Sequence, residues 1–206
     1  MKLIVSPRAP SPRRVLMFMA EKGITGIELE NVDLNAQEHK RDEFRAKSPT
    51  AKVPVLQLDD GRFLGETRAI CSYLEGLHPE PNLMGRDFTE HAFIEMWDRR
   101  IELYLFLGFA NCIRHTHPGL APLEQPQFPD FGAAQGEKVR ATARWLDAEL
   151  ATRPWIAGER FSIADITAFC AVEFAKLMKF RPGEEGMPHL QAWRDRVAER
   201  PGAKAQ

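Results

Sequence analysis

The sequence predicts an α/β segment followed by an all-α segment. In residues 1–77, apolar side chains alternate between the spacing of strands and the spacing of helices. After a Pro-rich break, the helical spacing continues almost alone. A chain of 206 residues has room for one or two domains. We therefore expect an α/β domain at 1–77, a linker at 78–87 and an all-helical bundle at 88–206.

The expected order of elements in the first domain is β-α-β-α-β-β-α. Gly23 closes the first helix, and Asp59-Asp60-Gly61 between apolar runs is typical of a hairpin turn. This order predicts a mixed sheet, with parallel strands first, an antiparallel hairpin second and helices on both faces. We expect strands at 2–5, 27–32, 53–58 and 62–64, and helices at 12–22, 42–47 and 67–77.

The segment 78–82 reads His-Pro-Glu-Pro-Asn, in which neither a helix nor a strand continues easily. Beyond it we expect helices at 88–114, 133–151, 163–179 and 188–200. At the start of the third helix, Ser162 and Asp165 match a capping box, flanked by Phe161 and Ile166 as a hydrophobic staple. We interpret these residues as structural and not catalytic.

The composition excludes several classes of function. The chain has 28 Lys and Arg against 29 Asp and Glu, so it has no basic excess for nucleic acid or an anionic membrane. It has neither an apolar run long enough to cross a bilayer nor an apolar leader at its start. Cys71, Cys112 and Cys170 are widely spaced, which favours buried thiols over a disulfide framework or a zinc site. We expect a cytoplasmic protein.

Three motifs follow one another along the chain: Val-Pro-Val-Leu at 53–56, Glu-Thr-Arg-Ala-Ile at 66–70 and Phe-Ser-Ile-Ala-Asp at 161–165. In this order they resemble the cytosolic glutathione S-transferases over nearly the whole chain. Further motifs at 38–40, 96–100 and 114–118 are most similar to the bacterial and fungal branch related to yeast glutathione transferase two. The resemblance implies a thioredoxin-like first domain, a homodimer, and transfer of the glutathione thiolate to a hydrophobic electrophile, with glutathione as co-substrate and no metal.

The resemblance assigns the cysteinyl part of glutathione to the main chain of Val53. Pro54 matches the family's cis proline, which leaves the Val53 amide and carbonyl facing outward, so that glutathione can pair with them like an added strand. The alternative is a proline that only ends a strand.

The two ends of glutathione are assigned to other residues. Glu66 meets the γ-glutamyl ammonium, and Thr67, at a helix N-terminus, meets the γ-glutamyl carboxylate. His39 and Lys52 match the pair that binds the glycyl carboxylate. Thr67 can also be a simple N-cap, and His39 and Lys52 can be solvated surface residues.

The group that activates the thiol departs from the family pattern. Ala9, which has no donor, stands where Ser-dependent relatives have their serine, and Ser11 follows two residues later. Either Ser11 takes over or another group lowers the thiol pKa. In the branch most similar to this chain, a water held by the long helix serves this role, and His115 is the best match. Alternatively, His115 and His117 only end their helix, and their spacing does not suit a metal.

The electrophile is expected in an apolar pocket lined from the first loop and the long helix. Leu103, Phe106, Leu107 and Ala110 supply apolar surface there, and we select Phe106 and Asn111 as lining residues. The rival hypothesis is a non-catalytic module of the same fold that retains glutathione binding.

Overall fold

The computed structural model describes residues 1–7 and 9–205, which form two compact units. The first unit contains Met1–Asn82 and the last residues of the chain, from Pro201 onward, and the second is Leu83–Arg200. The sequence analysis grouped 88–206 together. The difference arises because the short 3-10 helix η5 (Pro201–Lys204) packs on helix α1 (Pro10–Glu21).

The first unit has a four-stranded sheet in the order β2-β1-β3-β4. Strand β1 (Lys2–Val5) pairs parallel with β2 (Glu28–Asn31) and antiparallel with β3 (Val55–Gln57), which continues into the hairpin strand β4 (Phe63–Leu64). The predicted mixed sheet is confirmed, with shorter strands. Gly61 turns the hairpin with φ +86°, a conformation that favours glycine.

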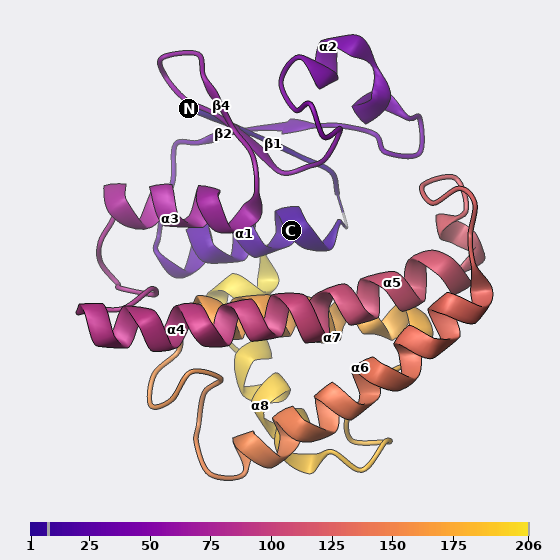
Figure 1. The fold of residues 1–206 in the computed structure, drawn as a ribbon. Coiled ribbons are helices and arrows are strands. Elements are labelled where there is room, and N and C mark those ends of the chain that lie inside the picture. The colour runs from indigo at the N-terminus through magenta and orange to yellow at the C-terminus, as the bar shows by residue number, and fades with distance from the viewer. Residues whose placement is uncertain (8, 206) are drawn as a thin grey trace. The chain divides into compact units, whose positions relative to one another are not determined.

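Helices cover both faces of this sheet. Figure 1 shows α1 and α3 (Thr67–Leu77) below the sheet and α2 (Asp42–Arg45) on its other side, after a 3-10 turn η1 (Glu38–Lys40). Helix α1 begins at Pro10, two residues earlier than predicted, because a proline in the first turn needs no amide partner. Ser11 therefore belongs to the first helical turn and not to the preceding loop.

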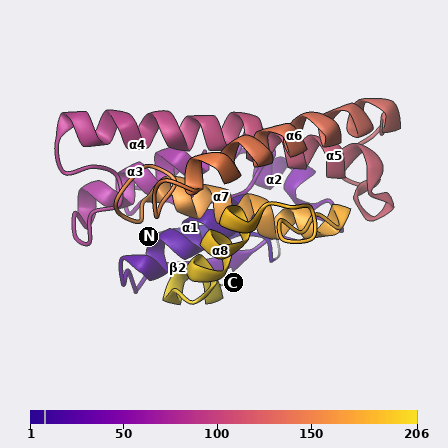
Figure 2. The ribbon, with the colours of Figure 1, turned by 90° about the horizontal axis from the view of Figure 1, so that it is seen from below.

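The second unit is all helical. Helix α4 (Phe88–Arg100) continues through a π-helical turn η2 (Ile101–Phe106) into α5 (Leu107–Thr116), so the predicted helix 88–114 is one long rod with a change of winding (Figures 1 and 2). Helix α6 packs along α5, and α8 packs on α6 and α7. The remaining elements are η3 (Pro118–Leu120), α6 (Pro129–Leu150), α7 (Ile163–Ala175), η4 (Lys176–Met178) and α8 (Pro188–Ala198).

Helix α7 forms the core of the second unit. Its residues from Ile163 to Val172 are all buried, and the predicted capping box of Ser162 and Asp165 starts it. The fully buried Asp165 carboxylate also accepts bonds from the Ile156 amide at 3.0 Å and the Trp193 indole at 2.8 Å. Burial raises the pKa of Asp165 to about 6, against the lowering effect of these donors. No helix within residues 1–7 and 9–205 is long and apolar enough to cross a membrane.

Candidate functional site

The main chain at Val53 is open to a ligand. The ladder between β1 and β3 ends at Val55, and the Val53–Pro54 peptide is cis. The Val53 side chain packs on the core cluster of Ile4, Val32, Phe44 and Val55. Among residues 1–7 and 9–205, neither the amide nor the carbonyl of Val53 has a hydrogen-bond partner. An extended peptide can therefore add two main-chain bonds here, as in strand addition.

Ser48 braces the segment that leads to Val53, and the sequence analysis missed it. The buried Ser48 hydroxyl donates to the Lys52 carbonyl at 3.0 Å and lies 3.3 Å from the Lys52 amide, from which it accepts. These bonds use both backbone groups of Lys52, whereas those of Val53 have no partner among the described residues. In the sequence, Ser48 directly follows the expected helix 42–47, and no motif marked it for this role. The Lys52 side chain is exposed, directly before Val53.

The N-terminus of α3 carries the second part of the site. Glu66, the N-cap, has φ +63°, a left-handed conformation that costs a non-glycine residue about 1–3 kcal/mol and is typical of functional sites. Thr67 is buried, and its hydroxyl donates to the Ser11 carbonyl at 3.4 Å. The N-termini of α1 and α3 therefore meet at this bond. The first amides of a helix, which have no partner within the helix, favour an anion.

His39 lies in η1 and is buried. Its Nδ1 has no hydrogen-bond partner in the described part of the chain. Burial, together with the charges of Lys40 and Arg45, lowers the pKa of His39, so the ring is mainly neutral at neutral pH. A buried ring nitrogen without a partner is costly, so a hydrogen bond to it would be favourable.

Three residues occupy the turn from β1 into α1. Ala9 is the N-cap of α1 and makes no side-chain cap bond. Ser11 is partly exposed, and its hydroxyl has no partner among the described residues. Ser6, which the sequence analysis did not select, is buried and its hydroxyl also lacks a partner in that part of the chain. Strands β1 and β3 are antiparallel, and Ile4 pairs with Val55. Continuing this register by two residues along each strand places Ser6 opposite Val53.

His115 lies in the second unit, in the last turn of α5. Its Nδ1 accepts from the Phe128 amide at 3.1 Å, so the neutral ring carries its proton on Nε2. That Nε2 lies 4.0 Å from a carboxylate oxygen of Glu124. Gly119 donates its amide to His117 Nδ1 at 3.1 Å. Both histidines therefore bind backbone where α5 ends, and His115 has only the Nε2 proton left to offer.

The residues expected at the electrophile pocket differ in their exposure. Phe106 and Ala110 are buried, Asn111 is half-buried, and Leu103 and Leu107 are exposed.

Cys71, Cys112 and Cys170 are buried thiols without a disulfide. Among residues 1–7 and 9–205, no group of three His, Cys, Asp or Glu side chains could hold a metal.

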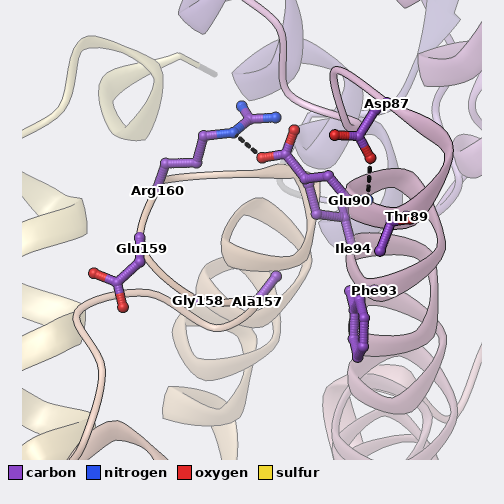
Figure 3. Close-up of a pocket in the computed structure, with 9 residues that line it drawn as sticks. All are labelled: Asp87, Thr89, Glu90, Phe93, Ile94, Ala157, Gly158, Glu159 and Arg160. Atoms are coloured by element: carbon purple, nitrogen blue, oxygen red, sulfur yellow. Dashed lines mark hydrogen bonds and ion pairs between the residues drawn. The ribbon is translucent and has the colours of Figure 1, made fainter.

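A separate cavity of about 450 Å³ lies within the second unit, between the start of α4 and the loop 157–160 (Figure 3). Phe93 and Ile94 form its apolar wall. Arg160 forms an ion pair with Glu90 at its rim and lowers the pKa of that carboxyl to about 2. These charges already neutralise one another, and the nine lining residues include none of the site residues predicted above.

Comparison with known proteins agrees with this architecture. Residues 3–82 match the model of the glutathione S-transferase N-terminal domain, and residues 115–201 match that of the C-terminal domain. The chain is 36% identical to glutathione S-transferase 2 of Saccharomyces cerevisiae, covering 98% of this chain and 88% of the relative. It is 30% identical to the Escherichia coli glutathione S-transferase GstA, with 98% and 94% covered.

Two solved structures are similar over almost their full length. The crystal structure of Gtt2 from Saccharomyces cerevisiae has a TM-score of 0.93 at 36% identity, with 99% of each chain covered. A glutathione S-transferase domain-containing protein of Marinobacter aquaeolei also has a TM-score of 0.93, at 40% identity, with 98% of this chain and 99% of that one covered. The chain therefore belongs to the glutathione S-transferase family.

Proposed function

We propose that this glutathione S-transferase binds glutathione as an added strand at Val53 and transfers its thiolate to a hydrophobic electrophile. The observation that carries the proposal is that the amide and carbonyl of Val53, beside β3, have no partner among the residues that the structure describes. Two antiparallel bonds to these groups hold the cysteinyl part of the ligand. The position of the sulfur then follows from the main chain and not from a flexible side chain.

Charges at the two ends of the ligand match the residues expected there. The exposed Glu66 faces the γ-glutamyl ammonium, and the Thr67 hydroxyl with the first amides of α3 faces the γ-glutamyl carboxylate. At the other end, His39 and Lys52 hold the glycyl carboxylate. His39 supports this role because its Nδ1 is buried and lacks a partner within the described residues.

Thiol activation needs a modest amount of energy. A free thiol of pKa about 8.5 is about 3% ionised at pH 7, and lowering its pKa to about 6.5 takes about 2.7 kcal/mol. One charge-assisted hydrogen bond contributes about 1.5–3 kcal/mol, and the N-terminus of a helix adds about 0.3–1 kcal/mol. Ser11 in the first turn of α1 can supply both effects. His115 is the second candidate, through a water that accepts its Nε2 proton.

Electrophile binding and assembly are assigned to the helical unit. Phe106 and Asn111 line the electrophile site in this proposal. Exposed apolar side chains follow one stripe of α4, η2 and α5, where Phe93 is 56% and Tyr104 is 59% exposed. Large apolar side chains exposed together mark interaction surfaces, and we assign this stripe to a second copy of the chain. Three buried cysteines without a disulfide fit a reducing cytoplasm.

The test combines calorimetry with glutathione and an assay with an aryl halide. We expect glutathione to bind and the aryl halide to be conjugated, with Ser11→Ala reducing ionisation of the bound thiol more than His115→Ala does. Binding without turnover of several electrophiles would favour a non-catalytic module instead. Absence of binding would refute the site itself.

A further inference from the structure

The C-terminal segment η5 lies along α1 and bonds to both of its ends. The Arg13 guanidinium donates to the Ala203 carbonyl at 3.1 Å, and the Gly202 amide donates to the Glu21 carboxylate at 3.0 Å. Arg13 and Glu21 are eight residues apart, which is about 12 Å along a helix. The two bonds are made to the neighbouring residues Gly202 and Ala203, so the long side chains of Arg13 and Glu21 reach this segment from the two ends of α1.

The contact is close as well as polar. Gly202 and Ala203 are buried. A Cβ atom on Gly202 would lie 2.7 Å from the Glu21 side chain and 2.8 Å from the Met17 carbonyl, and the latter is backbone that cannot rotate away. Position 202 therefore requires a glycine because of this close approach to the helix.

The first turn of α1 also carries Ser11. Its carbonyl is held by the Thr67 hydroxyl from α3, and Arg13, two residues later, is held by the C-terminal segment. The turn has no side-chain cap, because the N-cap residue is Ala9. The first turn of α1 therefore lacks the side-chain N-cap that usually stabilises the start of a helix.

We propose that the C-terminal segment Pro201–Lys204 is a brace that positions the thiol-activating turn of α1, with Arg13 and Gly202 as its positioning residues. This inference rests on the proposed function for its catalytic consequence. Loss of the brace lets the first turn of α1 open more often, which moves the Ser11 hydroxyl away from the sulfur. Glutathione binding itself changes little, because the main chain at Val53 belongs to another element.

The first experiment is independent of glutathione. Hydrogen exchange is measured on the full-length chain for the amides of Arg13, Arg14 and Val15, in the wild type and in Gly202→Ala. We expect these amides to exchange about tenfold faster in the variant. Lys204→Ala is the matched control on the exposed side of the same segment. Gly108→Ala is a control for general destabilisation, since its Cβ would lie 2.9 Å from the Val139 side chain in the second unit.

The second experiment measures the apparent pKa of the bound glutathione thiol from its thiolate absorbance, and the Kd for S-methylglutathione. Arg13→Ala is expected to reduce the thiolate fraction about threefold or more while the Kd changes less than about twofold. Arg13→Lys, which keeps a donor, is expected to restore much of the thiolate.

The outcomes separate the brace from the proposed function. Unchanged hydrogen exchange in α1 of Gly202→Ala, or an unchanged thiolate fraction in Arg13→Ala, would overturn the brace. Glutathione binding to the wild type would still uphold the proposed function in that case. Equal acceleration of exchange by Gly108→Ala would also overturn it. Failure of the wild type to bind glutathione would refute the proposed function, whereas faster exchange confined to α1 would still support the brace as a structural element.

Discussion

Removal of the Thr67 hydroxyl is expected to weaken glutathione binding strongly and folding only slightly. Thr67→Val keeps the shape of the buried side chain but removes its donor. Within the protein, the lost bond is the one to the Ser11 carbonyl, which is long at 3.4 Å. Its loss therefore costs folding about 0.5–1 kcal/mol, the low end for a neutral hydrogen bond.

The Thr67 hydroxyl contributes more free energy to its bond with the ligand, because the acceptor there is a charged carboxylate. A charge-assisted bond is worth about 1.5–3 kcal/mol, but the single hydroxyl proton leaves the Ser11 carbonyl to make it. The net loss of binding free energy is therefore about 1–2 kcal/mol, and the Kd for glutathione should rise about 5- to 30-fold. Calorimetry on the wild type, Thr67→Val and Thr67→Ser measures this, and the serine variant should retain most of the affinity. A glutathione analogue without the γ-glutamyl carboxylate closes a double-mutant cycle. If Thr67→Val binds glutathione within about twofold of the wild type, the assignment of the helix N-terminus to this carboxylate is wrong.

Three further predictions follow from the charges and surfaces of the structure. The lowered pKa of His39 leaves it neutral near pH 7, and a glycyl carboxylate would raise that pKa, so binding of S-methylglutathione, which has no thiol proton to release, should take up protons. Calorimetry in buffers of different ionisation enthalpy should show this uptake in the wild type but not in His39→Gln. Burial raises the pKa of Asp165 from 3.8 to about 6, so this group favours folding most below pH about 4, and about 3 kcal/mol is lost as the pH rises through about 6. Urea unfolding across this range should show that slope in the wild type and less of it in Asp165→Asn; equal slopes would exclude Asp165 as their source. Tyr104→Asp should raise the dimer Kd about tenfold or more in sedimentation, since it places a charge on the exposed apolar stripe, and unchanged association would assign the dimer to another face.

Local signals predicted much of the fold. Ser162 and Asp165 formed a capping box as expected, because that motif depends only on neighbouring residues. The mixed sheet followed from the order of elements and from the hairpin signal at Gly61. The change of winding at Ile101–Phe106 was not predicted, because a single π-helical turn, with i→i+5 bonds, shifts the apolar spacing by only about one residue.

The features that were missed depend on contacts distant in sequence. Lys22 looked like an ordinary helix end, yet its buried amine bonds to Glu75 at 2.6 Å and to the Pro81 carbonyl at 2.7 Å. The C-terminal segment looked like the end of the helical domain, and only its packing shows that Gly202 belongs with α1.

In the candidate site too, the residues marked by a local motif were predicted and those that depend on distant contacts were missed. The resemblance selected Val53, Glu66 and Thr67 from short motifs with a fixed order. Ser48 and Ser6 were not selected, because a serine has no local signature for bracing a loop or for lying opposite an unpaired residue on the next strand. The tautomer of His115 was also beyond the sequence, since it depends on the Phe128 amide, 13 residues away.

The central claim is that the main chain of Val53 holds glutathione, and a modified ligand tests it without changing the protein. Glutathione methylated on its cysteinyl amide nitrogen cannot donate to the Val53 carbonyl, whereas methylation of the glycyl amide leaves both bonds to Val53 possible. Calorimetry should show that the cysteinyl-methylated peptide binds about tenfold or more weakly than glutathione, and that the glycyl-methylated peptide loses much less. Equal affinity of the cysteinyl-methylated peptide and glutathione would contradict the account.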